Sequence, residues 1–297
     1  MATASSRAGG PLALGLTGWL LLTPALLLVG VLLIGLGWML ELSLHELDIA
    51  TYRLKPEYTL ANYETIFGRP VTWLVLWRTL AGATLVTAFT MILAFPYAYL
   101  LVRTRSGLVR KGLLVALFLP FFIGQVVRAY GWLIILGREG FLNSVLVGIG
   151  LPAQDLLFTY GTVLFGLVQY MLPFAVLLLV PALTAIPDDV ERASEGLGAG
   201  WPATFFYVLI PMARPGLIGA SVVVFTLTLT DFAMPEILGG GTQDFFASAI
   251  YDAFFQISNA GLGAALAITL TAVGSLIVAV IFIFVGTGTL GFRAAQR

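Results

Sequence analysis

The sequence predicts an all-α polytopic membrane protein with six transmembrane helices and both termini in the cytoplasm. Of the 297 residues, 59% are hydrophobic and only 10% are charged, and the mean hydropathy is +1.00. A soluble domain of this length cannot bury so much apolar surface in one core, whereas lipid surrounds such surface on every side of a helix. Membrane lipid is therefore an expected partner of the chain.

Six charge-poor runs are long enough to be transmembrane helices, which need about 20 apolar residues to cross the hydrocarbon layer. The first run is too long for a signal peptide and is not followed by an A-x-A cleavage pattern, so we predict an uncleaved first span. The six runs are Gly18 to Leu40, Trp73 to Val102, Gly112 to Leu136, Leu157 to Leu183, Val208 to Phe232 and Ala264 to Leu290.

The positions of Lys and Arg predict the orientation, because positively charged flanks stay in the cytoplasm. With both termini inside, nine basic residues are cytoplasmic and four are external. The cytoplasmic set is Arg7, Arg103, Arg105, Arg110, Lys111, Arg192, Arg214, Arg293 and Arg297, and the external set is Arg53, Lys55, Arg69 and Arg138. The strongest contribution comes from the loop between Arg103 and Lys111.

The composition excludes several kinds of site. The chain has no cysteine, which excludes disulfides, thiolate catalysis and cysteine metal sites. His45 is the single histidine, which argues against a histidine-based metal site, and the net charge of zero argues against a nucleic-acid partner. Neither Lys55 nor Lys111 stands in a G-x-x-x-x-G-K setting, so we expect ATP to be handled by a separate protein.

Two external connections are predicted to hold structure of their own. The segment from Glu41 to Pro70 has mixed charge and is expected to cap the external face. The segment from Arg138 to Asp155 has Gly and Pro around a short apolar stretch, which suits a helix lying at the membrane surface.

The cytoplasmic connection from Ile186 to Gly216 is the most informative. Pro187 followed by two aspartates suits the first turn of a helix, because the positive end of the helix dipole favours acids. Asp188 and Arg192 are spaced for an i,i+4 pair, and Gly198 with Gly200 is expected to end the helix. The spacing alone leaves two interpretations open, an ordinary surface helix or a docking segment.

This connection resembles the EAA loop of the permease subunits of ABC importers, whose pattern is E-A-A, three residues, G, nine residues and I-x-L-P. Arginine replaces the first glutamate, although Glu191 lies one place earlier. The E-A-A positions hold Arg192, Ala193 and Ser194, the glycine is Gly198, and the I-x-L-P end holds Val208, Ile210 and Pro211. The resemblance implies that Glu191, Arg192, Ala193, Ser194, Gly198 and Pro211 couple the chain to an ATPase.

The resemblance extends from Thr59 to Gly291 and is closest to the spermidine/putrescine-type branch. It is carried by TLANYETIF at Thr59, LPFFIGQVVRAYGWLIILGREGFLN at Leu119 and DFAMPEILGG at Asp231. It implies a type I ABC importer permease fold in a bacterial inner membrane, with a tail, first span and start of the external loop at 1–58, a five-helix core at 59–291 and a cytoplasmic tail at 292–297.

The same resemblance implies the partners. The loop at 186–216 would contain a coupling helix that docks on cytoplasmic ATPase subunits, which bind ATP and Mg. A periplasmic solute-binding protein would deliver the solute, and a second permease subunit, commonly a different chain, would complete the path. The permease itself would bind no cofactor and perform no chemistry.

Candidate residues for the solute path are ionisable or aromatic groups in or near the spans, because charges in lipid normally face a protein interior or a water-filled path. For a polyamine, carboxylates would offset the positive charge and aromatic faces would hold ammonium groups. Alternatively, Arg128 snorkels or fixes helix packing, Asp231 caps a helix, and the aromatic residues serve packing. The candidates are Arg128, Tyr130, Trp132, Tyr170, Asp231 and Glu236.

Other functions remain open at this point. Related permeases carry ferric iron, phosphonates and other small solutes. An ion-coupled secondary transporter would also be apolar and polytopic, but it usually has related halves and broken helices at corresponding positions. An intramembrane hydrolase would need a catalytic dyad, for which the loop residue His45 and the lone intramembrane Asp231 give little support.

Overall fold

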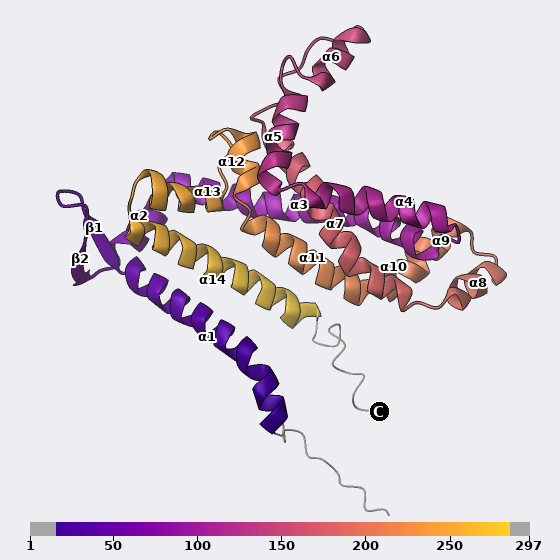
Figure 1. Ribbon diagram of the computed structural model, residues 1–297, viewed down its shortest axis with the longest axis horizontal. Helices are drawn as coiled ribbons and strands as arrows, with labels where there is room; N and C mark the ends of the chain where they lie inside the picture. Colours follow the sequence, from indigo (N-terminus) through magenta and orange to yellow (C-terminus); the bar gives the residue numbers. More distant parts are fainter. Residues whose placement is uncertain (1–15, 286–297) are drawn as a thin grey trace, which may run out of the picture.

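The computed structural model describes residues 16–285, most of which are helical, and arranges the helices as an elongated bundle (Figure 1). Within this part, four helices are long and apolar enough to cross a membrane, and the number rises to six if each of two bent helix pairs is one span. The four are α1 (Leu16–Ser43), α3 (Pro70–Arg103), α7 (Tyr160–Thr184) and α14 (Ala260–Val285). The predicted tail at 292–297 lies outside the described residues.

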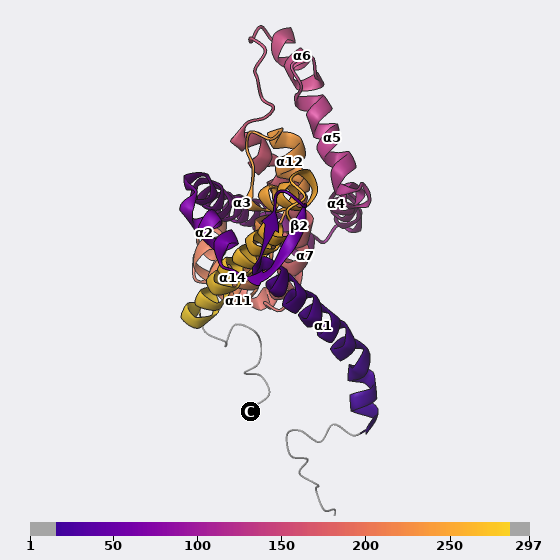
Figure 2. The same cartoon turned by 90° about the vertical axis from the view of Figure 1, so that its left-hand side faces the viewer.

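The third predicted span is not one straight helix. It consists of α4 (Gly107–Phe118), η1 (Leu119–Phe122) and α5 (Gln125–Leu136), and the chain bends by 99° at the break. Pro120 has no N–H for the helix ladder and Gly124 lies at the break itself, so helical pairing stops there. Helix α5 therefore projects from the bundle, as Figure 2 shows.

The predicted external helix is present as α6 (Phe141–Gly148), at the tip of the projecting arm. Its loop is closed by buried Asn143, whose Nδ2 donates to the backbone oxygens of Gly137 and Gln154 at 3.0 and 2.9 Å. The position of α6 relative to the membrane surface remains a prediction.

The fifth predicted span is also broken. Short helices α9 (Trp201–Thr204), η2 (Phe205–Leu209) and α10 (Ile210–Met212) precede α11 (Arg214–Leu229), and the chain bends by 72° between them. Pro211 and Pro215 each remove one N–H from the ladder, which explains why the helix cannot continue straight.

The segment predicted to be external contains a β-hairpin, so the all-α prediction was incomplete. Strands β1 (His45–Asp48) and β2 (Arg53–Tyr58) pair antiparallel, with Leu47 opposite Leu54, and α2 (Ala61–Gly68) follows. Asp48 stabilises the turn, because its carboxylate accepts from Ala50 N and Thr51 Oγ1 at 2.9 Å each.

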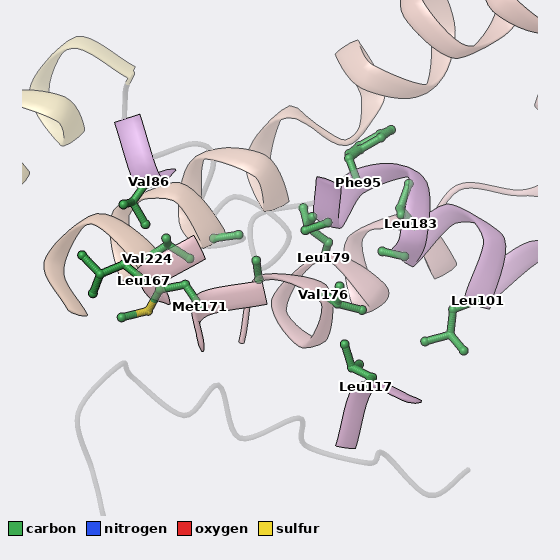
Figure 3. Close-up of a cluster of buried hydrophobic side chains, with 14 of the residues drawn as sticks. Val86, Phe95, Leu101, Leu117, Leu167, Met171, Val176, Leu179, Leu183 and Val224 are labelled. Carbon is green, nitrogen blue, oxygen red and sulfur yellow. The ribbon is translucent and has the colours of Figure 1, made fainter. Parts of the chain in front are cut away.

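The core lies where α3, α7 and α11 pack together, with α4 alongside (Figure 3). Helices α7 and α11 approach closely at Gly216, where a Cβ atom would overlap that of Ala182. Helix α1 packs on α14 and otherwise exposes apolar side chains. Buried side chains of the core include Val86, Phe95, Leu167, Met171, Leu179 and Val224.

The remaining short helices lie at the two ends of the bundle. Helix α8 (Asp188–Gly196) lies far from the hairpin. Helices α12 (Ala233–Gly239) and α13 (Phe246–Tyr251), with η3 (Asp252–Gln256), connect α11 to α14. Helix α3 runs from the hairpin end to the α8 end, so it contacts elements at both ends of the molecule.

Candidate functional site

Helix α8 forms where the sequence predicts a short helix in the 186–216 connection. Acidic residues occupy its first turn, and Gly198 follows its end in the left-handed conformation with φ +86°. The amides of Gly198 and Ala199 donate to the oxygens of Glu195 and Ser194 at 2.9 and 3.1 Å. This pattern is a Schellman motif, in which glycine at the left-handed position ends the helix.

The inner face of α8 is held by the end of α3. Arg103 Nε donates to Glu191 Oε1 at 2.6 Å, and its Nη1 pairs with Asp188 Oδ1 at 2.7 Å. The predicted i,i+4 pair of Asp188 with Arg192 does not form. Arg192 instead pairs with Asp189 at 3.2 Å, because the carboxylate of Asp188 is already engaged by Arg103.

The outer face of α8 is exposed. Arg192, Ala193 and Gly198 are open to the surroundings, and Leu197 is 90% exposed. Ser194 instead faces α9, where its hydroxyl lies 2.9 Å from Thr204 Oγ1. Glu191 and Ser194 thus lie on the held side of the helix and Arg192 and Ala193 on the open side, while Pro211 lies within α10 beyond the turn.

Three of the predicted path residues meet between α5 and α7. Arg128 is buried, and its guanidinium lies 5.5 Å from the centre of the Tyr170 ring. Its Nη2 donates to the oxygens of Pro120 and Ile123, while Nε and Nη1 are buried without a hydrogen-bond partner in the described residues. Trp132 lies on the same helix and donates from Nε1 to Gln169 at 3.4 Å.

Asp231 is buried directly after α11 and both of its carboxylate oxygens are engaged. Oδ1 accepts from the Met234 amide at 3.1 Å, at the start of α12, and Oδ2 accepts from Gln125 Nε2, in the first turn of α5. Asp231 does not pair with Arg128 in the described structure. Its contacts join the projecting arm to the C-terminal end of α11.

The other two candidates lie apart from this cluster. Tyr130 is on α5 but is largely exposed. Glu236 on α12 belongs to an acidic group with Asp244 and Asp252. Burial raises the pKa of Glu236, and the charges of Asp252 and Asp244 raise that pKa further.

Residues 4–287 match the family described as "Binding-protein-dependent transport system inner membrane component". The chain belongs to this family. Such permeases are non-enzymatic transmembrane subunits, and the ATPase activity lies in a separate subunit. The protein is accordingly a multi-pass inner-membrane permease of an ABC importer.

Two relatives and one solved structure place this permease more closely. It is 34% identical over 265 residues to the inner membrane ABC transporter permease protein YdcU of Escherichia coli K12, covering 84% of each chain. It is 30% identical to the spermidine/putrescine transport system permease protein PotB of the same strain, covering 89% of this chain and 93% of PotB. The fold is shared with a chain of a bacterial alginate ABC transporter, solved in complex with an alginate pentasaccharide-bound periplasmic protein. The TM-score is 0.69 at 19% identity, and the match covers 89% of this chain and 95% of that chain.

Several residues of the permease's polar contacts were not predicted from the sequence. Gln125 and Gln169 are neutral, so a search for intramembrane charges passes over them. In the sequence, Arg103 indicates only topology, although in the fold it holds α8 through contacts with residues more than 80 positions away. The motif LPFFIGQ indicates the neighbourhood of Gln125 but not its role.

Proposed function

We propose that this permease forms the translocation path for a polyamine such as spermidine or putrescine. It would have six spans, with α4–α5 and α9–α11 each counted as one, and both termini in the cytoplasm. Separate ATPase subunits would bind ATP and Mg, a periplasmic solute-binding protein would deliver the solute, and a second, different permease chain would complete the path.

The geometry of α8 carries the proposal of coupling. A helix that docks on a partner needs one face fixed to its own protein and another face open. Here Glu191 and Ser194 are on the fixed face, and Arg192, Ala193 and Leu197 are on the open face. Gly198 turns the chain after the helix, and Pro211 separates this segment from α11. We assign α8 as the coupling helix and its open face as the surface that contacts the ATPase.

A direct test of coupling uses Leu197→Asp. Introducing a charge at an apolar contact should prevent co-purification of the ATPase subunit and stop ATP-dependent uptake, while membrane insertion persists. Ile49→Asp is the matched control, because Ile49 is also highly exposed but lies in the hairpin turn at the other end. Normal ATPase recovery with Leu197→Asp would refute the assignment.

The acidic group supports a cationic solute. Burial, followed by the negative charge of Asp252, raises the pKa of both Glu236 and Asp244, and an arriving cation would relieve that repulsion. The 30% identity to PotB over most of both chains points to the same class of solute. In this proposal Asp231 and Glu236 contribute negative charge, and Tyr130, Trp132 and Tyr170 contribute aromatic faces along the path.

The topology has its own test, since the chain has no native cysteine. Single cysteines at Ser106 and Ala203 should react only with reagent that reaches the cytoplasm, and a cysteine at Thr51 only from outside. Labelling of Thr51 and Ala203 from the same face would rule out the six-span arrangement.

Arg128 favours a second candidate solute, an anion such as a phosphonate. Its Nε and Nη1 have no partner in the described residues, and a buried guanidinium is stabilised by an oxyanion. Both nitrogens are shielded from solvent, so α5 would have to move for an anion to reach them. Inhibition of uptake by the competing solute distinguishes the candidates: spermidine should compete under the first proposal, and methylphosphonate under the second.

A further inference from the structure

Arg103 makes an unusually complete set of contacts with the start of α8. Its Nε donates to Glu191 Oε1 at 2.6 Å, Nη1 pairs with Asp188 at 2.7 Å, and Nη2 donates to the backbone oxygen of Ile186 at 2.8 Å. All three guanidinium nitrogens are therefore directed at one helix terminus. The planar, rigid guanidinium makes such a set directional, which a lysine ammonium cannot reproduce.

The contact with Glu191 is shielded and reinforced. Arg103 and Glu191 side chains are 17% and 16% exposed, whereas in each other ion pair of residues 16–285 at least one partner is far more exposed. The second oxygen of Glu191 accepts from Tyr99 OH at 2.8 Å. Both carboxylate oxygens of Glu191 are thus held by α3, and solvent screens this pair less than a surface pair.

At its opposite end, the same helix contacts the loop after α12 and the first residue of α13. Thr79 Oγ1 accepts from the Phe246 amide at 2.8 Å, and Arg78 Nη1 donates to the Thr242 oxygen at 3.3 Å. Helix α3 has 34 residues, so it is about 50 Å long. Helix α3 thus joins the neighbourhood of Asp244, a member of the acidic group, to α8 by polar contacts at both ends.

We propose that Arg103 is a positioning residue for coupling: with Glu191 and Asp188 it clamps α8 to α3, so that α8 and α3 move together. This inference rests on the proposed role of α8 as the coupling helix. When the clamp is intact, a shift of α3 reaches the ATPase through α8. When it is broken, α8 still docks, but its position no longer depends on α3.

The test uses the whole transporter, purified with its ATPase and permease partners and reconstituted in proteoliposomes with the binding protein. The variant is Arg103→Gln, and the readout is ATP hydrolysed per solute imported. We expect this ratio to rise about tenfold. Loss of one charge-assisted hydrogen bond typically changes an equilibrium constant by about this factor, here the one between clamped and unclamped α8. The ATPase should still co-purify. Arg103→Lys should give an intermediate ratio, because the charge remains and the fork is lost.

Arg105→Gln is the matched control, since Arg105 is two residues further along, is exposed and makes no ion pair in the described structure. It should leave the ratio at the wild-type value. If Arg103→Gln fails to assemble, Tyr99→Phe removes one hydrogen bond to Glu191 without changing charge and should raise the ratio by a smaller factor.

A wild-type ratio in an assembled Arg103→Gln or Tyr99→Phe transporter would overturn the clamp. Failure of the proposed coupling role of α8 looks different, because Leu197→Asp would then recover the ATPase normally.

Discussion

Gly198 provides the sharpest test of how the end of α8 is shaped. Its φ is +86°, and a Cβ atom added there would meet no heavy atom within 4 Å. A larger side chain therefore has room, and the cost of substitution comes from the left-handed backbone. For a residue other than glycine this cost is about 1–2 kcal/mol, which corresponds to a factor of about 5–30 in the ratio of native to non-native turn.

The perturbation is Gly198→Phe, compared with Gly198→Asn. Phenylalanine disfavours positive φ, whereas asparagine tolerates it. We expect Gly198→Phe to lower ATPase co-purification and uptake by at most about 30-fold, in proportion to the loss of the native turn. Gly198→Asn should remain within about twofold of wild type.

Two assays on the same membranes check this, namely recovery of the ATPase subunit and initial uptake rate. Gly107→Phe is the bulk control, because Gly107 is equally open, lies near the same end and has an ordinary φ. Equal effects of Phe and Asn at position 198 would refute the backbone argument. An equal loss with Gly107→Phe would instead point to side-chain bulk as the cause.

Three further predictions concern other parts of the permease. Asp231→Asn should lower the unfolding free energy by about 1–3 kcal/mol, because both oxygens of Asp231 accept hydrogen bonds. Transport and melting are measured on one preparation. Lost transport with unchanged melting would instead support a charge role in the path. Burial raises the pKa of Asp244, so its contribution to stability is greatest in acid and is lost as the pH rises through the folded-state pKa. Asp244→Asn should therefore melt higher than wild type near pH 7 and lose this advantage near pH 4, and a difference that does not change with pH would contradict the prediction. Gly216→Ala should destabilise the folded permease by about 1–3 kcal/mol through overlap with Ala182. Gly219→Ala, with open space at its Cβ, should be neutral in the same melting assay. Equal melting of the two variants would show that α7 and α11 separate without cost.

Hydropathy predicted the straight helices well because it depends only on local composition. The runs beginning at Gly18, Trp73 and Leu157 lie within three residues of the start of α1, α3 and α7. It failed where prolines break an apolar run. Pro120 and Pro211 are visible in the sequence, but their effect on direction depends on which neighbouring helix satisfies the freed backbone groups.

The hairpin and the α8 clamp could not be predicted in the same way. Strand β2 has the sequence RLKPEY, with a proline and without the apolar alternation that indicates a strand. The clamp joins Arg103 to Glu191 across 88 positions, and one sequence contains no signal that such distant residues meet. Helix α8 itself was predictable, because its acidic first turn and terminal glycine act locally.

The arginine at the first position of the loop motif has a physical explanation in this fold. Neighbouring residues on a helix differ in direction by about 100°, so Glu191 and Arg192 cannot both face α3. Glu191 faces inward and meets Arg103, while Arg192 faces outward beside Asp189. Arginine at position 192 therefore leaves the inward anchor intact and changes only the charge presented on the open face. If α8 docks as proposed, the ATPase surface opposite Arg192 should carry an acidic side chain, where the family glutamate would require a basic one.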